Sequence, residues 1–504
     1  MTSASSLNNS CVCTLHPFGT IDFNVSHIGF GGYRIHSHSR EHWKALGYAL
    51  EKGFNLIDTS SNYTAGESER LVGACLASMI KKSEINREDV LIVSKAGYVQ
   101  AGNLAMARER EANGNPFPEM VKYMDGCWHC IHPDFLENQL QRTLDNLQMD
   151  RLDIYLLHNP EYFLTNIKKN RTMDLQSARQ EYERRIARAF RWLEEKVKAS
   201  KIQAYGISAN TFINSAEDFE FTSLERMLEL AEAITPDHNF KVIQFPFNLF
   251  EAGACLEKNQ ANGSKTLLEV ALEKNMGTMI NRPLNAITDN RMIRLTSFEK
   301  IDYQTTMDSF AALRKKIQEL ESRFKNYFKV KWPEGITAAP VNRLFTNAYY
   351  LPSALLEVRG WEQWDYEKEY RILPQMYEDL NSLSGKIPDD SAWQEWVEEF
   401  SRSLSGMMEI ATAHFQASKN SFSEMFCKQL DDLEPALKSS PSLSRKALRI
   451  LRSVPGINCI LLGMRKQDYV DDAFDVLKEP PIQNAARILS AIAKETLVQQ
   501  WNKA

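Results

Sequence analysis

Four polar side chains of different chemistry stand at or just after the ends of short apolar runs. They are the carboxylate Asp58 in FNLIDTSSNYTAGESE, the phenol Tyr63, the ammonium Lys95 in VLIVSKAG and the imidazole His158 in DIYLLHNPE. Taken singly, each has an ordinary explanation: a helix cap, a loop aromatic, a surface charge and a hydrogen-bonded core histidine. Taken together, they favour a catalytic site for acid–base chemistry at a carbonyl or an alcohol.

The elements that must position these groups alternate along the chain. Each apolar run is typical of a buried parallel strand, and segments with helical spacing separate the runs. Such alternation predicts parallel βα units. In a (β/α)8 barrel the carboxyl ends of the strands form the catalytic face, where residues from different strands meet. We therefore predict an α/β fold, a (β/α)8 TIM barrel, preceded by a hairpin over 14–24 and carrying a long polar loop over 98–132.

The barrel pattern stops after the seventh strand, GTMIN, and its next helix comes only at 443–452. The block between them is helical in pattern. Phe310, Leu313, Ile317, Leu320, Phe324 and Tyr327 recur at helical spacing, and a second helix is expected over 391–418. We predict a packed helical subdomain here, inserted between strand 7 and helix 7.

The expected domains follow from this interruption. They are a barrel formed by 14–285 and 441–480, a helical insertion subdomain over 286–440 on the catalytic face, and a helical C-terminal tail over 481–504. Because strand-to-helix loops emerge on the catalytic face, the insertion is expected to act as a lid or pocket wall. A subdomain that leans outward and makes only an oligomer contact is the alternative.

Length and charge narrow the class of protein. The 504 residues leave room for a barrel of about 250 residues and one large insertion. The net charge of −5 gives no reason to expect a nucleic-acid partner, and no apolar run is long enough for a membrane span. The first residues, MTSASSLNNSC, lack the features of a signal peptide. Eight cysteines in a chain of this length suit a reducing compartment, so we expect a cytoplasmic protein.

The cysteines also offer one candidate metal site. Cys11 and Cys13 form one pair, and Cys127 and Cys130 form a second pair with His129 between them. Zinc needs four ligands within tetrahedral reach. The two pairs lie far apart in the sequence, and the first lies near a terminus that we expect to be disordered. We therefore favour free thiols and no bound metal.

Seven segments follow one another in the order found in the aldo-keto reductases, and the chain resembles that family. They are DTSSNYTAGESERLVG, SKAG, LLHNPE, YGISAN, IQFPFNLFE, the RPL of NRPLN, and PGINCILLGMRK. The resemblance covers roughly 14–285 and 440–480. It implies an NADP(H)-dependent oxidoreductase that interconverts a small carbonyl compound, an aldehyde or ketone, and its alcohol.

The resemblance also implies a role for each catalytic candidate. Tyr63 would be the general acid or base, and Lys95 would lower its pKa. Asp58 would orient Lys95, while His158 would position the carbonyl. An adjacent ammonium is the physical means by which a tyrosine becomes a useful acid at neutral pH.

The hydride must come from a cofactor, because no side chain supplies one. The chain lacks a GxGxxG segment after a strand, which argues against a Rossmann domain. By resemblance, Ser208, Asn210 and Gln244 would contact a nicotinamide carboxamide, with Asn248 assisting. Gly31, in the glycine-rich turn after the first strand, is a further cofactor candidate. The phosphate groups would bind beside Gly463 and Arg465 after the last strand. The guanidinium of Arg465 can take a 2′-phosphate in a fork, which favours NADPH over NADH; the alternative for Arg465 is a solvated helix start.

One departure from the family concerns the end of the seventh strand. The family often has an aromatic residue there that stacks on the nicotinamide, whereas this chain has Asn281, followed by Arg282, Pro283 and Leu284. These four residues are still candidates for cofactor contact. Because asparagine cannot stack comparably, a second hypothesis stays open: a regulatory or binding protein on a reductase fold that binds the cofactor with little turnover.

Overall fold

The computed structural model describes residues 13–288, 291–297, 302–331, 341–345, 363–364, 367–384, 387, 391–417 and 419–494. These residues form two compact units, and the chain passes from one to the other near Leu295 and again near Leu430. The first unit holds the barrel and the second holds the helices inserted between these two points. Among the described helices, none has an apolar stretch long enough to cross a membrane.

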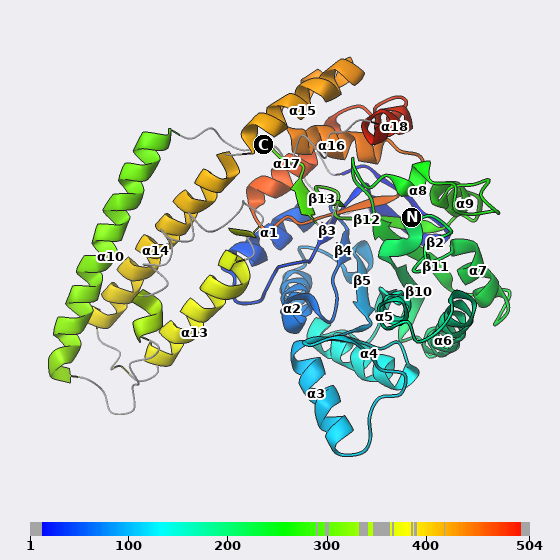
Figure 1. Ribbon diagram of the computed structural model, residues 1–504, viewed down its shortest axis with the longest axis horizontal. Coiled ribbons are helices and arrows are strands. Elements are labelled where there is room, and N and C mark those ends of the chain that lie inside the picture. The colour runs from blue at the N-terminus through cyan, green and yellow to red at the C-terminus, as the bar shows by residue number, and fades with distance from the viewer. Residues whose placement is uncertain are drawn as a thin grey trace. The chain divides into compact units, whose positions relative to one another are not determined.

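Eight parallel strands close the barrel, as the sequence predicts (Figure 1). Around the barrel they follow the order β10-β11-β12-β15-β3-β4-β5-β9. Their bounds are Ile28–Gly31 (β3), Leu56–Asp58 (β4), Leu91–Ala96 (β5), Leu152–His158 (β9), Ile202–Ser208 (β10), Phe240–Pro246 (β11), Gly277–Asn281 (β12) and Cys459–Leu462 (β15). The runs are almost wholly buried, since one face fills the barrel and the other packs under helices.

A hairpin closes the amino-terminal end of the barrel. Its strands β1 (Leu15–Phe18) and β2 (Ile21–Ser26) pair antiparallel, so the predicted hairpin is confirmed. Phe18, Ile21 and Val25 join the same buried cluster as interior residues of the barrel strands. Gly19 in its turn has φ +57°, and a Cβ at this position would lie 2.3 Å from the backbone nitrogen of Gly277. Only glycine allows this close approach.

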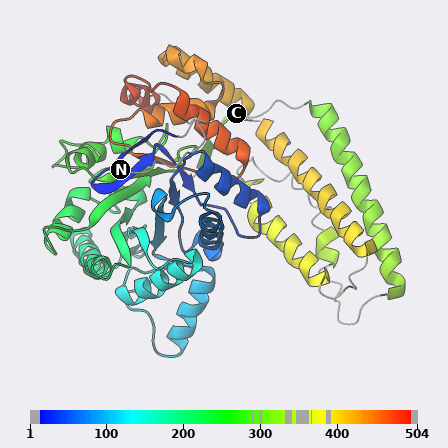
Figure 2. The ribbon, with the colours of Figure 1, turned by 180° about the vertical axis from the view of Figure 1, so that it is seen from behind.

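Helices surround the strands in both views, as the alternation of the sequence predicts (Figures 1 and 2). They are α1 (Arg40–Glu51), α2 (Glu67–Lys81), α4 (Pro133–Leu147), α6 (Leu175–Lys198), α7 (Leu224–Glu232), α9 (Leu267–Glu273), α16 (Leu443–Arg452) and α17 (Gln467–Lys478). Short helices α5 (Tyr162–Asn170) and α8 (Gly253–Leu256) lie in loops, and α18 (Ala485–Lys494) forms the described part of the tail. Side-chain caps begin several of them; Thr266 and Glu269 form a capping box at α9.

The prediction of a polar loop over 98–132 is wrong. The segment contains α3 (Ala101–Ala112) and a small antiparallel sheet made of β6 (Tyr98–Val99), β7 (Val121–Met124) and β8 (Cys127–His129). Val99, Leu104, Ala107, Phe117, Cys130 and Phe135 form its own core. The sequence does not predict this small subdomain, because α3 buries few apolar side chains and its apolar residues therefore show only weak helical spacing.

The expected helical block begins with a hairpin. Strands β13 (Asn285–Thr288) and β14 (Arg291–Arg294) follow β12 directly and belong to the barrel unit. The second unit contains α10 (Tyr303–Lys331), the π-helical turn η4 (Lys368–Ile372), α13 (Leu373–Ser384) and α14 (Ser391–Ala417), whereas α15 (Asn420–Leu433) runs across the second boundary. Buried side chains from α10 and α14 share one core, so both helices expected from spacing are present. Trp396 also donates a hydrogen bond to the carbonyl oxygen of Leu320 at 2.8 Å.

Candidate active site

Strand register brings the predicted site residues to one rim of the barrel. Gly31 at the end of β3 lies opposite Asp58 at the end of β4. His158 at the end of β9 lies opposite Ser208 at the end of β10, and Ser208 lies opposite Gln244 on β11. Because the strands are parallel, all of these ends meet at the carboxyl-terminal face.

Asp58 and Lys95 form a buried ion pair at this rim. The Nζ atom of Lys95 lies 2.6 Å and 2.7 Å from the two carboxylate oxygens and 2.8 Å from the carbonyl oxygen of Thr59. Both side chains are almost fully excluded from solvent. An ammonium has three protons to donate, so these three acceptors satisfy Lys95 completely. The predicted orientation of Lys95 by Asp58 agrees with this geometry.

Tyr63 lies on the loop that follows β4, at the start of a short 3-10 turn, η1 (Tyr63–Gly66). The next two residues, Thr64 and Ala65, have φ values of +46° and +57°, a conformation that costs about 1–2 kcal/mol for a residue with a Cβ. The Thr64 hydroxyl donates to the carbonyl oxygen of Ile35 at 2.6 Å and helps to hold the turn. The loop is thus strained beside the expected acid.

Lys95 lies beside the aromatic ring of Tyr63, with Nζ 4.8 Å from the ring centroid. The effect of Lys95 on the pKa of Tyr63 stays a prediction. Burial raises the pKa of Tyr63 well above its usual value, and the negative charge of Asp58 raises it further. Because every proton of Lys95 is directed to Asp58 and Thr59, none is left to stabilise a phenolate by a hydrogen bond.

His158 lies edge-on to Tyr63, with ring centroids 6.0 Å apart. Burial lowers the pKa of His158 well below its usual value, and the charge of Lys95 adds to this effect. The imidazole is therefore neutral at physiological pH. Its Nδ1 atom lies 3.2 Å from the hydroxyl of Ser60, which can act as donor or acceptor there. The Ser60 hydroxyl also lies 2.7 Å from Oδ1 of Asn62 and 3.2 Å from the carbonyl oxygen of Lys95, and its single proton serves only one of these acceptors. Where the proton is donated to Nδ1 of His158, Nε2 carries the imidazole proton and can donate to a substrate oxygen.

The small sheet over 98–129 supports His158 from behind. The ring of Tyr98 lies edge-on at 4.7 Å from that of His158, and Nε2 of His129 donates to the carbonyl oxygen of His158 at 2.7 Å. Gly97 makes this approach possible, since a Cβ there would lie 2.4 Å from the same carbonyl oxygen. Ser60, Tyr98 and His129 were not predicted from the sequence. Ser60 stands inside the DTSSNY motif, but only the folded chain reveals the contacts of the other two.

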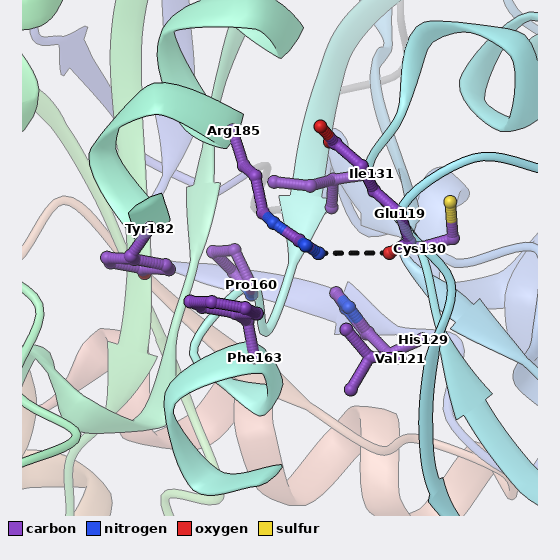
Figure 3. Close-up of a pocket in the computed structure, with 9 residues that line it drawn as sticks. All are labelled: Glu119, Val121, His129, Cys130, Ile131, Pro160, Phe163, Tyr182 and Arg185. Atoms are coloured by element: carbon purple, nitrogen blue, oxygen red, sulfur yellow. Dashed lines mark hydrogen bonds between the residues drawn. The ribbon is translucent and has the colours of Figure 1, made fainter. Parts of the chain in front are cut away.

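His129 also lines a small pocket (Figure 3). It is lined by Glu119, Val121, His129, Cys130, Ile131, Pro160, Phe163, Tyr182 and Arg185. The guanidinium of Arg185 donates to the carbonyl oxygen of Glu119 at 3.0 Å, and its cation lies over the ring of Phe163. None of the four catalytic candidates lines this pocket.

Two of the cofactor candidates are connected to the Asp58–Lys95 ion pair by hydrogen bonds, one directly and the other through it. The Ser208 hydroxyl donates to Oε1 of Gln244 at 2.8 Å, and Nε2 of Gln244 donates to Oδ1 of Asp58 at 2.8 Å. Ser208 and Gln244 are buried. A continuous hydrogen-bonded chain therefore connects the end of β10 to Lys95.

Other cofactor candidates lie at the ends of neighbouring strands. The backbone N–H of Asn210 donates to Oε1 of Glu161 at 2.8 Å. Asn248 donates to Glu251 at 2.7 Å and to the carbonyl oxygen of Arg282 at 3.2 Å. Arg282 has φ +55° and pairs with Glu251 at 2.7 Å. It is followed by Pro283 and Leu284, whose carbonyl oxygen accepts from the backbone of the residue after β14.

Several buried polar atoms at these strand ends have no hydrogen-bond partner among the described residues. They include Oδ1 of Asn281, Nε of Arg282 and Oε2 of Glu161. Buried polar groups in proteins are normally satisfied. Their concentration at the ends of β9 and β12 is what a binding site for a polar ligand would produce.

The phosphate candidates meet at the ends of β3 and β15. A Cβ at Gly31 would lie 3.2 Å from the backbone of Leu462 and 3.4 Å from the nitrogen of Gly463, so glycine keeps this turn tight. Gly463 is exposed. Arg465 is partly exposed just before α17, close enough to His42 for its charge to help lower the pKa of that histidine.

The described residues contain no group of three or more histidine, cysteine or acidic side chains that could hold a metal ion. Cys127 instead accepts a hydrogen bond from Gln100 at 3.2 Å, and the thiol of Cys130 donates to the carbonyl oxygen of Pro118 at 3.4 Å. Cys11 lies outside the described residues.

The aldo/keto reductase family model matches residues 27–326. The chain belongs to this family. Among its curated relatives, the NAD(P)H-dependent D-xylose reductase of Scheffersomyces stipitis is 25% identical over 192 residues, which cover 37% of this chain and 49% of the relative. The NADH-specific methylglyoxal reductase of Escherichia coli is 27% identical over 150 residues, which cover 28% and 40% of the two chains. This aldo/keto reductase thus spans about half or less of the length of these relatives.

Solved structures of the family align over most of the chain but with low scores. An aldo/keto reductase from Klebsiella pneumoniae in complex with NADP and acetate is 12% identical, with a TM-score of 0.43 over 96% of this chain and 97% of the other. The glycerol dehydrogenase from Gluconobacter oxydans is 15% identical, with a TM-score of 0.44 over 95% and 94%.

Proposed function

We propose that this aldo/keto reductase is an NADP(H)-dependent oxidoreductase that interconverts an aldehyde or ketone and the corresponding alcohol. The observation that carries the proposal is the gathering of Tyr63, the Asp58–Lys95 pair and His158 at one rim. These groups can supply a proton, a positive charge and a neutral hydrogen-bond donor to one carbonyl oxygen.

In the reduction direction, Tyr63 donates its proton to the carbonyl oxygen. Its raised pKa keeps the phenol protonated before the reaction. The ammonium of Lys95, 4.8 Å from the ring centroid, then stabilises the phenolate that is left behind. In the tautomer that carries its proton on Nε2, His158 donates to the same oxygen and orients the substrate.

The cofactor candidates fit a nicotinamide dinucleotide. NADPH supplies the hydride when it is bound. Ser208, Asn210, Gln244 and the stretch that begins at Asn281 offer donors and unpartnered acceptors for a carboxamide. The tight turn at Gly31, the exposed Gly463 and the partly exposed Arg465 offer room and charge for phosphates. Curated relatives include one named NAD(P)H-dependent and one named NADH-specific, so the preference for NADPH needs its own test.

The inserted helical unit is proposed to limit access to the substrate. It enters the chain after the carboxyl end of β12 and leaves it before α16, and loops at that end of a barrel strand usually shape the pocket. Hydrogen exchange of peptides from α10 and α14, with and without NADPH and a carbonyl substrate, tests this role. Exchange that neither compound changes would contradict a lid.

The test of the activity is oxidation of NADPH by the purified chain with a panel of aldehydes and ketones. Tyr63→Phe should lower the rate at least about a hundredfold while NADPH still binds, because only the proton donor is removed. Tyr48→Phe is the matched control, since its hydroxyl binds Asp471 outside the barrel. Turnover of Tyr63→Phe within about tenfold of wild type would show that another group is the acid.

Asn281 is the one observation that favours the alternative function, a binding or regulatory protein that binds the cofactor with little turnover. It occupies the place where the family often has an aromatic residue, and its Oδ1 is buried without a partner among the described residues. A binding or regulatory protein would bind NADPH but turn over none of the carbonyl compounds in the panel.

A further inference from the structure

Glu161 is a buried carboxyl group that the proposed mechanism does not use. It lies three residues after His158, directly before α5, and its side chain is 3% exposed. Its Oε1 accepts a hydrogen bond from the backbone N–H of Asn210 at 2.8 Å. Its Oε2 is buried and has no hydrogen-bond partner among the described residues.

The bond to Asn210 joins two loops of the catalytic face. Asn210 begins η3 (Asn210–Ile213), the turn directly after β10, and Ser208 ends that strand. Glu161 lies on the loop that follows β9, the strand that ends at His158. The same two loops also meet through the backbone, where the N–H of Asn159 donates to the carbonyl oxygen of Ser208 at 2.7 Å. Glu161 therefore adds a side-chain connection at the place where the carboxamide is expected to bind.

The groups around Glu161 do not neutralise a negative charge on it. Tyr98, Tyr162 and Tyr182 approach it from β6, α5 and α6, and its charge contributes to the raised pKa of each phenol. All three are therefore uncharged. Glu220 approaches from the segment before α7, and Arg282 from the end of β12. Arg282, whose charge lowers the pKa of Glu161, is already paired with Glu251.

These surroundings favour the acid form of Glu161. Burial raises the pKa of Glu161 to about 8, and the negative charge of Glu220 adds to the effect. Hydrogen bonds from the backbone of Asn210 and of Glu161 itself, and the charge of Arg282, act in the opposite direction but do not reverse it. Burying an uncharged oxygen without a hydrogen-bond partner costs much less free energy than burying an anionic oxygen without one.

We propose that Glu161 is a positioning residue: as an uncharged carboxylic acid it holds the loop after β10 in place, and its ionisation loosens the cofactor site. The inference rests on the proposed binding of NADP(H) at Ser208 and Asn210. An ionised Glu161 would draw water toward its unpartnered oxygen, and the two loops would have to separate to admit it. Binding of NADP(H) would then weaken as the pH rises through the ionisation.

Hydrogen exchange of the cofactor-free chain tests the positioning role without any activity. The peptide to follow covers 208–213, and rates are corrected for the intrinsic dependence of exchange on pH. In wild type, protection should hold from pH 6.5 to 7.5 and decrease across a midpoint near pH 8. In Glu161→Gln, which keeps a neutral acceptor for Asn210, protection should stay constant. The matched control Glu220→Gln should keep the decrease but at a lower midpoint, because Glu220 binds Thr165 and Lys168 rather than Asn210, while its charge helps to raise the pKa of Glu161.

NADPH affinity, measured by fluorescence on the same proteins, connects this change to function. If only the acid form binds well, the Kd of wild type should rise about tenfold between pH 7 and pH 9, and that of Glu161→Gln less than about twofold. A wild-type exchange profile that is flat across pH 8 overturns the inference, even where NADPH binds and even where Glu161→Gln does not fold. A profile that changes as expected in a chain that binds no NADPH supports the positioning role and contradicts the proposed function.

Discussion

Gln244 donates a hydrogen bond from Nε2 to Oδ1 of Asp58 over 2.8 Å, across the rim from β11 to β4. Asp58 in turn holds Lys95, and Ser208 donates to the other end of the Gln244 amide. The residues expected to hold a nicotinamide carboxamide are thus bonded to the ion pair beside Tyr63. A carboxamide that replaced Ser208 as the hydrogen-bond partner of Gln244 would act on Asp58 through that one side chain, and cofactor binding would then be coupled to the ion pair.

The first prediction is that Gln244→Leu weakens both NADPH binding and turnover. It removes a hydrogen bond to a charged group, which is worth about 1.5–3 kcal/mol and corresponds to roughly tenfold to a hundredfold in affinity. Fluorescence titration and steady-state kinetics measure the two effects. Gln203→Leu is the matched control, because Gln203 lies on the neighbouring strand β10 with its side chain exposed. If Gln244→Leu changes the affinity for NADPH no more than this control does, the hydrogen bonds that connect Ser208 to Lys95 do not contribute to cofactor binding.

The second prediction is that Lys95→Met destabilises the barrel as well as abolishing turnover. It leaves the Asp58 carboxylate buried without a cation, and breaking such a pair costs about 3–5 kcal/mol. The double variant Asp58→Asn/Lys95→Met should recover most of this stability, since no charge is left unpaired, yet remain inactive. Thermal or urea unfolding of the three proteins measures the effect. A single variant as stable as the double variant would show that the pair contributes nothing to folding.

The barrel was predictable because its signals are local. Apolar runs of strand length ended by a polar residue identify the strands, and Pro133 at the first position of α4 marks the start of a helix. The segment over 98–132 escaped prediction for the opposite reason. This segment is held in its fold by contacts such as that of Phe117 with Phe135. Such contacts join residues from separate elements and produce no regular spacing of apolar residues in the sequence.

The residue types of the candidate site could be predicted from the sequence, but the pKa values and supporting contacts of these residues could not. The types and order of Asp58, Tyr63, Lys95 and His158 are visible in the sequence, because each ends or follows a strand. The raised pKa of Tyr63 is not visible, since it depends on burial and on the nearby charge of Asp58 in the folded chain. The support that His129 gives to His158 depends likewise on the folding of a distant hairpin.

The third prediction concerns the choice of cofactor. Arg465→Ala should raise the Kd for NADPH about tenfold and leave that for NADH unchanged, because only NADPH carries a 2′-phosphate for the guanidinium to bind. Lys466→Ala, at the adjacent exposed cap of α17, is the control. Titration of both cofactors with all three proteins is the measurement. Equal affinities for the two cofactors that Arg465→Ala leaves unchanged would remove Arg465 from the site.

The fourth prediction is that the barrel loses stability in mild acid partly through His129. Burial lowers the pKa of His129 to about 4, so the folded chain keeps this imidazole neutral and able to donate from Nε2 to His158. The unfolded chain binds a proton there near pH 6.5. The contribution to stability is therefore complete above about pH 6.5 and is lost as the pH falls toward 4, by up to about 3 kcal/mol.

His129→Gln isolates this contribution. Glutamine can still donate an N–H toward the carbonyl oxygen of His158, but it does not titrate. Wild type should be the more stable protein at pH 7, and the difference in the free energy of unfolding should shrink by about 2–3 kcal/mol at pH 4.5. The control His38→Gln, at an exposed histidine on the loop before α1, should leave the acid sensitivity of wild type unchanged. Urea unfolding at both pH values measures the difference, and parallel losses of stability in wild type and His129→Gln would contradict the prediction.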